Sequence, residues 1–197
     1  MVAAASPRLV LASSSPYRRD LVARLRLDFN THSPNIDESA RDGEAPGALA
    51  LRLASAKAAA VAPRFQDALI IGSDQVAMAG GSQLAKPGNR AAAIAQLQAM
   101  SGLSITFHTA LCLLNPARRR QQTALVPVNV TMRTLTHGEI ERYVDADQPF
   151  DCAGSARIEG LGIALVENIS GDDPSALIGL PLIELCRMLR NEGVDLP

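Results

Sequence analysis

Among the charged residues of the first 90, two carboxylates and four cationic side chains form a combination suited to work on phosphate groups. Each lies at an expected loop, strand end or helix start, or on an apolar helix face; the six are Glu38, Asp74, Arg18, Arg19, Lys57 and Lys86. Carboxylates that hold Mg²⁺ or Mn²⁺ amid lysines and arginines are what hydrolysis of a nucleoside triphosphate requires. The basic side chains would hold the phosphates in line. Together these residues predict a hydrolytic site for a phosphorylated substrate.

Asp74 is the most informative of the six. It follows the apolar run Leu69–Ile71 and Gly72-Ser73, at the end of a strand that should be buried. An unpaired buried carboxylate is costly, so Asp74 needs a cation, a hydrogen-bond donor or a metal. Ligands in open α/β sheets gather at the carboxyl ends of strands, where Asp74 would lie. The alternative is an aspartate that accepts backbone N–H bonds in a turn.

The stretch Ser13-Ser14-Ser15-Pro16-Tyr17-Arg18-Arg19 joins an expected strand at 9–12 to a helix at about 16–26. Pro16 suits the first helical position, and Ser15 suits the N-cap. Free backbone N–H groups, hydroxyls and two guanidiniums at a helix start favour an anion such as phosphate. A Walker loop is excluded, because its G-x-x-x-x-G-K-[ST] pattern occurs nowhere in the chain. The alternative is a capped helix with two solvated arginines.

The other three candidates also have ordinary alternatives. Lys57 lies on the apolar face of an expected helix at 46–62, from which it could extend its ammonium to solvent. Lys86 precedes Pro-Gly and a helix at 89–100, again at an anion-binding helix start. Glu38 lies in a polar loop, where surface charge is usual.

Strands and helices alternate along the chain, though imperfectly, which indicates an α/β fold with a mixed sheet. The pattern predicts strands at 105–114 and 124–135, joined by the basic loop Arg118–Arg120, which should be exposed. Thr136 to Glu139 reads as a capping box for a helix that ends near 146. Residues 151–169 read as a glycine-punctuated loop running into a strand, and a last helix begins at Pro181.

Composition and charge limit the class of protein. Of 197 residues, 47% are hydrophobic and 20% charged, which is typical of a globular chain with one domain of about 200 residues. A net charge of −1 makes general binding to nucleic acid or to a membrane surface a poor prediction. Three widely spaced cysteines indicate reduced thiols, and the N-terminus is no convincing signal peptide. We therefore expect a cytoplasmic protein.

The chain resembles the Maf nucleotide pyrophosphatases along nearly its whole length. The matching stretches, in order, are LASSSPYRRDL, the DE of NIDES, LRLASAKA, IIGSDQV, the KPG of LAKPG, QLQAMSG, DCAGS, EGLGI and DDPSALIGLPL. The resemblance implies an inosine-triphosphatase-like fold, with a long, twisted mixed β-sheet flanked by helices. Residues 1–197 would form one Maf-like domain, with two lobes around a central cleft. It also implies hydrolysis of a nucleoside triphosphate to a monophosphate and pyrophosphate with a divalent metal, Mg²⁺ or Mn²⁺.

The resemblance implies roles for individual residues. Asp74 would be the acidic catalytic residue, described as the proton acceptor, and a metal ligand together with Glu38. The positions that bind phosphate or metal correspond here to Ser13, Arg18, Glu38, Lys57 and Lys86, and Arg19 is expected to join the phosphate-binding set. At two places the chain departs from the family's sequence pattern, and both bear on its affinity for the substrate. Ala85 stands where the family has glycine, and Ala156-Arg157 replace an aromatic residue and a lysine.

Three positions track substrate choice in the family, and this chain has Tyr17, Gln75 and Glu159 there. These residues, with the DCAGS and EGLGI stretches, are similar to the subgroup that acts on 7-methyl-GTP. Members of the dTTP/UTP type carry arginine, threonine and glutamine instead. The 7-methylguanine ring is cationic, which suits an aromatic face, and Glu159 can accept from the guanine N1–H and 2-amino group.

We therefore expect 7-methyl-GTP to be hydrolysed to 7-methyl-GMP and diphosphate, which removes a modified nucleotide from the pool. One alternative is a dTTP/UTP pyrophosphatase of the same family. Another is a non-catalytic nucleotide-binding regulator of cell division. The acidic pair Glu38 and Asp74 favours catalysis, because a binder could lose it. The expected partner is a small-molecule nucleotide, and a homodimer is also expected, because members of such families are often dimers.

Overall fold

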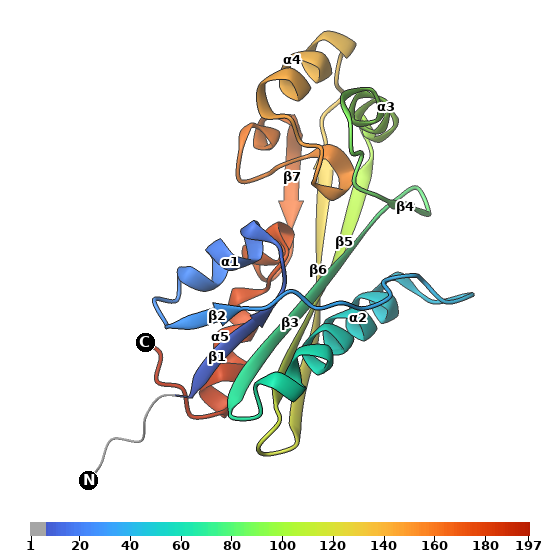
Figure 1. Cartoon of the computed structure of the whole chain (residues 1–197). Helices are drawn as coiled ribbons and strands as arrows, with labels where there is room; N and C mark the ends of the chain where they lie inside the picture. Colours follow the sequence, from blue (N-terminus) through green and yellow to red (C-terminus); the bar gives the residue numbers. More distant parts are fainter. Residues whose placement is uncertain (1–6) are drawn as a thin grey trace.

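A seven-stranded mixed sheet runs through the chain in the order β2-β1-β3-β5-β6-β7, with β4 paired to β3. The computed structural model describes residues 7–197 (Figure 1). The strands are β1 (Arg8–Ala12), β2 (Phe29–Thr31), β3 (Ala68–Ala79), β4 (Ser82–Leu84), β5 (Ser104–Asn115), β6 (Arg120–Met132) and β7 (Val166–Ser170). β1 pairs in parallel with β2 and β3, whereas the pairs β3–β5, β5–β6 and β6–β7 are antiparallel. The predicted mixed α/β sheet is confirmed.

Five α-helices flank this sheet, and four short 3-10 helices join other elements. They are α1 (Pro16–Ala23), α2 (Pro46–Val61), α3 (Arg90–Met100), α4 (His137–Asp147), α5 (Leu182–Asn191), η1 (Ala62–Arg64), η2 (Ala153–Ser155), η3 (Leu161–Leu165) and η4 (Pro174–Ile178). The capping box predicted at Thr136 and Glu139 starts α4. α1 ends earlier than predicted, because the chain leaves the helix in a turn that takes Arg26 to a positive φ of 55°.

Alternate residues of β1 divide the core between two faces of the sheet, as the pleat of a strand requires. Leu9 and Leu11 pack with α1 and α5 on one face, while Val10 and Ala12 pack with α2 on the other. A third cluster lies where α3 and α4 cover the far ends of β5 and β6. Figure 1 shows α3 and α4 at one end of the long strands and α1, α2 and α5 nearer the opposite end. That the chain forms a single domain remains a prediction.

Asp74 lies inside β3 and not at its end. Asp74 was expected at the strand's end, but β3 continues through it to Ala79. The parallel pairing with β1 stops earlier, where Ala12 pairs with Gly72. Asp74 therefore lies beyond the carboxyl end of β1, inside a strand that β5 still pairs on its other side. The edge of β3 is open at Asp74 because the neighbouring strand β1 is shorter, not because β3 ends there.

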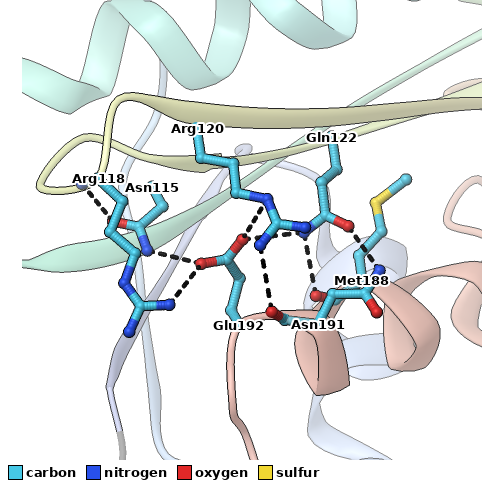
Figure 2. A network of polar contacts seen from close by, with 7 residues as sticks. All are labelled: Asn115, Arg118, Arg120, Gln122, Met188, Asn191 and Glu192. Atoms are coloured by element: carbon cyan, nitrogen blue, oxygen red, sulfur yellow. Dashed lines mark hydrogen bonds and ion pairs between the residues drawn. The ribbon is translucent and has the colours of Figure 1, made fainter.

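The basic loop between β5 and β6 is exposed, as predicted, and its arginines hold the end of α5. The Glu192 side chain, only 1% exposed, accepts from Asn115 Nδ2 at 2.8 Å and from Gln122 Nε2 at 3.1 Å. Arg120 Nε and Arg118 Nη1 lie 3.3 and 3.7 Å from the same carboxylate (Figure 2). This network joins the β5–β6 hairpin to the C-terminal helix.

Glu192→Ala is expected to lower the free energy of unfolding by about 3 kcal/mol, because it removes the acceptor of the half-buried Asn115 amide and one of the two acceptors of Gln122 Nε2. Arg118→Ala should cost less than about 1 kcal/mol, because an exposed ion pair contributes little. Urea denaturation at neutral pH measures both. Equal costs for the two variants would contradict this account of the network.

Among residues 7–197, no helix combines the length and apolar character that crossing a membrane requires. Residues 1–6, which bear on the prediction about a signal peptide, lie outside the described part of the chain.

Candidate active site

A cleft of about 390 Å³ opens beyond the carboxyl end of β1. Segments distant in sequence line it: the β1–α1 connection, α2, the middle of β3, the segment after β4, residues 151–159 and the end of η4. Of the predicted site residues, the lining includes Ser13, Tyr17, Arg18, Glu38, Lys57, Asp74, Gln75, Lys86 and Glu159. Arg19 is not brought into the cleft; its side chain is exposed, and its Nε lies 3.5 Å from Asp20 Oδ1.

Lys57 joins the two predicted metal-binding carboxylates. Its Nζ lies 2.6 Å from Asp74 Oδ1 and 2.8 Å from Glu38 Oε1. The Lys57 side chain is 7% exposed and that of Asp74 is 11% exposed, whereas Glu38 is largely solvated. Lys57 therefore does not extend to solvent from α2, and Asp74 does not cap a turn. A buried ammonium and carboxylate in contact satisfy each other's charge.

Close packing of α2 against β3 brings this pair together. Gly72 lies two residues before Asp74, and a Cβ at this position would be 2.2 Å from the backbone oxygen of Ala54 on α2. Only glycine permits such an approach of helix and strand. Lys57 follows Ala54 by about one helical turn, so it faces the strand beside Asp74. The contact thus depends on the absence of a side chain at Gly72.

The start of α1 has the capping predicted for it. The Ser15 hydroxyl accepts from the Arg18 N–H at 3.4 Å, and the Ser13 hydroxyl accepts from the Ser15 N–H at 3.0 Å. The Arg18 guanidinium turns toward the cleft, where its Nε donates to the Gly179 carbonyl at 2.8 Å. Burial lowers the pKa of Arg18, and the charges of Asp74 and Glu38 oppose that shift. Arg18 thus faces both carboxylates across the cleft.

Lys86 lies in a segment that hydrogen bonds attach to the residue before Asp151 and to α3. The Gly88 N–H donates to the Phe150 carbonyl at 2.9 Å, and Gln96 Nε2 donates to the Ala85 carbonyl at 3.0 Å. Gly88 has a φ of +72°, which favours glycine. Ala85 is not among the residues with positive φ, so its backbone accepts the methyl group that replaces the family's glycine.

Gln75 has a fixed orientation. Its Nε2 lies 2.9 Å from the Ala176 carbonyl, 3.1 Å from the Leu177 carbonyl and 2.9 Å from Thr109 Oγ1. Because carbonyl oxygens only accept, the amide nitrogen must face them. The Gln75 amide oxygen is consequently the group available to a ligand.

Tyr17 and Glu159 also line the cleft, together with residues that had no predicted role. Tyr17 Oη donates to the Asp151 carboxylate, and burial raises the pKa of the Glu159 carboxyl group. Arg157 pairs with Asp147 at the end of α4, and its backbone oxygen accepts from the Gly160 and Gly162 N–H groups. The stretches DCAGS and EGLGI pointed to this region as motifs, but no pattern within them singled out Asp151, and Arg157 was noted only as a departure from the family pattern.

The carboxylates fit a divalent metal that is shared with a substrate. Within residues 7–197, no group of three or more His, Cys, Asp and Glu side chains could hold a metal ion. Glu38 and Asp74 supply oxygen ligands of the kind that Mg²⁺ prefers, and their two negative charges are paired with only one ammonium, that of Lys57. Mg²⁺ is commonly bound by one or two carboxylates, with water and substrate phosphates completing its coordination. These two residues meet that requirement.

Comparisons with known proteins place this chain among related sequences. The sequence model of a family described as "Maf-like protein" matches residues 8–192. A protein of Methylobacillus flagellatus called "7-methyl-GTP pyrophosphatase" is 56% identical over 189 residues, covering 96% of this chain and 98% of the relative. A protein of the same name from Xanthomonas oryzae pv. oryzae is 56% identical over 191 residues, covering 97% of this chain and 100% of the relative. Another from Thiobacillus denitrificans is 55% identical over 190 residues, covering 96% of this chain and 94% of the relative.

Proposed function

Because this chain belongs to the Maf family, we propose that it is a nucleoside triphosphate pyrophosphatase that converts 7-methyl-GTP to 7-methyl-GMP and diphosphate. One observation carries the proposal. A single cleft holds the Lys57–Asp74–Glu38 group together with Tyr17, Gln75 and Glu159. Relatives more than half identical over nearly their full length carry the name of this activity, which supports the choice of substrate.

The chemistry would divide among the residues on the carboxylate side. Arg18, Lys57 and Lys86 would bind the phosphate oxygens, with the Ser13 hydroxyl as a further donor. Asp74 would accept the proton of the attacking water, and the bond between the α- and β-phosphates would break so that diphosphate leaves. Glu38 and Asp74 would hold Mg²⁺ or Mn²⁺, which when bound offsets charge on the phosphates and acidifies a water.

The base would lie on the opposite side, against Tyr17. An aromatic face attracts a cationic ring by about 0.5–2 kcal/mol, and the 7-methylguanine ring carries a positive charge. Glu159 would accept from the N1–H and 2-amino group and would also offset that charge. The Gln75 oxygen, which its hydrogen bonds direct away from η4, would accept from a donor on the nucleotide.

Pyrophosphate release from a panel of nucleotides tests the proposal. The panel contains 7-methyl-GTP, GTP, UTP, dTTP and ITP with Mg²⁺ or Mn²⁺, and Asp74→Asn serves as the inactive control. Release mainly from 7-methyl-GTP supports both the reaction and the substrate. Release mainly from UTP or dTTP would indicate the alternative member of the family. A folded protein that releases pyrophosphate from none of them would instead be a nucleotide-binding regulator.

Glu159→Gln is expected to lower the ratio of kcat/KM for 7-methyl-GTP to that for GTP by about tenfold. The amide loses the negative charge, and its nitrogen cannot accept from the guanine donors. The ratio is measured by steady-state kinetics on both nucleotides. An unchanged ratio of kcat/KM values would mean that Glu159 takes no part in recognition of the base.

The cellular role follows from the reaction. Removal of 7-methyl-GTP would keep a modified nucleotide out of RNA, in the cytoplasm where nucleotides are used. We propose that the enzyme acts on its small-molecule substrate without binding nucleic acid, and that it forms a homodimer. Light scattering after gel filtration tests the homodimer.

A further inference from the structure

We propose that Asp151 is a further specificity-determining residue, and that its negative charge selects nucleotides with a positively charged base. The proposal rests on the function proposed above, because it places the 7-methylguanine ring beside Tyr17 and Glu159. Asp151 lines the same cleft as these two residues.

A hydrogen bond from Tyr17 fixes the position of the Asp151 carboxylate. Tyr17 Oη lies 3.1 Å from Asp151 Oδ1 and 3.0 Å from Oδ2, although the two residues are 134 positions apart. Cys152 Sγ lies 3.6 Å from the same phenol oxygen. A ring held at its hydroxyl presents its face in one orientation, which favours stacking with a base. Asp151 therefore orients Tyr17 while it places a charge beside it.

No neighbouring cation neutralises Asp151. Arg157 pairs with Asp147 instead, and the hydrogen bond between them raises the pKa of Arg157. Within the part of the chain that the structure describes, no Lys, Arg or His nitrogen lies within 4 Å of the Asp151 carboxylate. This negative charge is consequently available to a ligand.

The Tyr17 phenol and the Cys152 thiol beside it are neutral, and Arg157, which also lies near the phenol, has its charge paired with that of Asp147. Burial is the main cause of the raised pKa of the Tyr17 phenol and of the Cys152 thiol, whose pKa rises to about 11. Both groups are therefore protonated at neutral pH. Glu159 supplies a second carboxylate on this side, while Arg18 and Lys57 lie with the acidic pair on the other.

The resulting charge pattern matches a nucleotide with a cationic base. Two carboxylates and an aromatic face on one side attract a positive ring, as in aromatic sites for quaternary ammonium groups. Lysine and arginine on the other side attract a triphosphate. 7-Methyl-GTP carries both charges, whereas GTP carries only the negative one. The Asp151 charge should therefore favour the methylated base specifically.

The competing explanation is that Asp151 orients Tyr17 without selecting the charge of the base. Two substitutions distinguish these explanations. Asp151→Asn removes the charge but keeps an oxygen that accepts from the Tyr17 phenol. Asp151→Ala removes both the charge and the acceptor. Asp67→Asn is a matched control, because Asp67 is exposed, precedes β3 and is not part of the cleft lining.

The test is equilibrium binding of 7-methyl-GMP and GMP, measured by calorimetry, since binding of these products requires no turnover. The ratio of the Kd for GMP to the Kd for 7-methyl-GMP is expected to fall about tenfold in Asp151→Asn, as loss of one nearby charge implies. Asp67→Asn should leave this ratio unchanged.

Three results would overturn the proposal. An unchanged ratio in both Asp151 variants would mean that the residue has no part in recognition. If the preference for 7-methyl-GMP were lost only in Asp151→Ala, the role of Asp151 would be to orient Tyr17 and not to select charge. A wild-type protein that binds both nucleotides equally would exclude charge selection. If the wild type prefers 7-methyl-GMP but hydrolyses no 7-methyl-GTP, the proposed function fails while charge selection survives, so the two failures are distinguishable.

Discussion

Asp74→Asn is expected to lower kcat for 7-methyl-GTP by at least about a thousandfold, the upper part of the range for loss of a general base. The amide cannot accept the proton of the attacking water, and it is a poor metal ligand. The variant should remain folded, because its amide oxygen still accepts from the buried Lys57 and Glu38 still pairs with that ammonium. Steady-state pyrophosphate release measures kcat, and circular dichroism reports the fold.

Two comparisons separate catalysis from binding in this experiment. The Kd for 7-methyl-GMP should change far less than kcat, because in the proposed mode of binding Asp74 would face the reacting phosphates and not the base. Asp67→Asn removes a carboxylate near the start of the same strand, outside the cleft, and should retain wild-type kcat. A kcat in Asp74→Asn above about a tenth of the wild-type value would show that another group accepts the proton.

Elements with local signals could be predicted from the sequence. The Ser15 cap, Pro16 and the Thr136–Glu139 capping box each depend on residues within one helical turn, and the structure confirms all of them. β2 could not be predicted, because it has only three residues and depends on pairing with β1.

The prediction that Asp74 lies at the end of its strand was wrong for a physical reason. β3 continues past Asp74 because distant groups satisfy the polar residues that follow Ile71. The Ser73 hydroxyl donates to the Ala110 and Gly179 carbonyls, and Asp74 pairs with Lys57. These partners lie 37, 106 and 17 residues away, so no local pattern reveals them.

The candidate site shows the same division. The charged residues of the site could be predicted from the sequence, and the structure places Glu38, Asp74, Lys57 and Arg18 around one cleft. Arg19 shared every local signal with Arg18, but the helix turns its side chain to solvent. The bond between Tyr17 and Asp151 joins two segments 134 residues apart, and nothing in either segment predicts the other.

Gly72→Ala is expected to lower the free energy of unfolding by about 3–5 kcal/mol, at the upper end of the cost of overpacking a core. The new Cβ would be 2.2 Å from the Ala54 carbonyl oxygen and 3.0 Å from the backbone nitrogen of Ala58. Both atoms belong to the backbone of α2, so the whole helix must move to relieve the contact. Because α2 carries Lys57, this movement should also lower kcat. Urea denaturation and pyrophosphate release measure the two effects.

Gly138→Ala is the matched control for this substitution. Its Cβ would meet only Arg142 Nη1, the end of a flexible side chain, at 3.3 Å. Gly138 lies in the first turn of α4, where alanine should leave stability unchanged or raise it by up to about 1 kcal/mol. If Gly72→Ala proved as stable as Gly138→Ala, the helix would not approach the strand closely enough to require glycine. If Gly72→Ala lost stability but kept wild-type kcat, the position of Lys57 beside Asp74 would not depend on that approach.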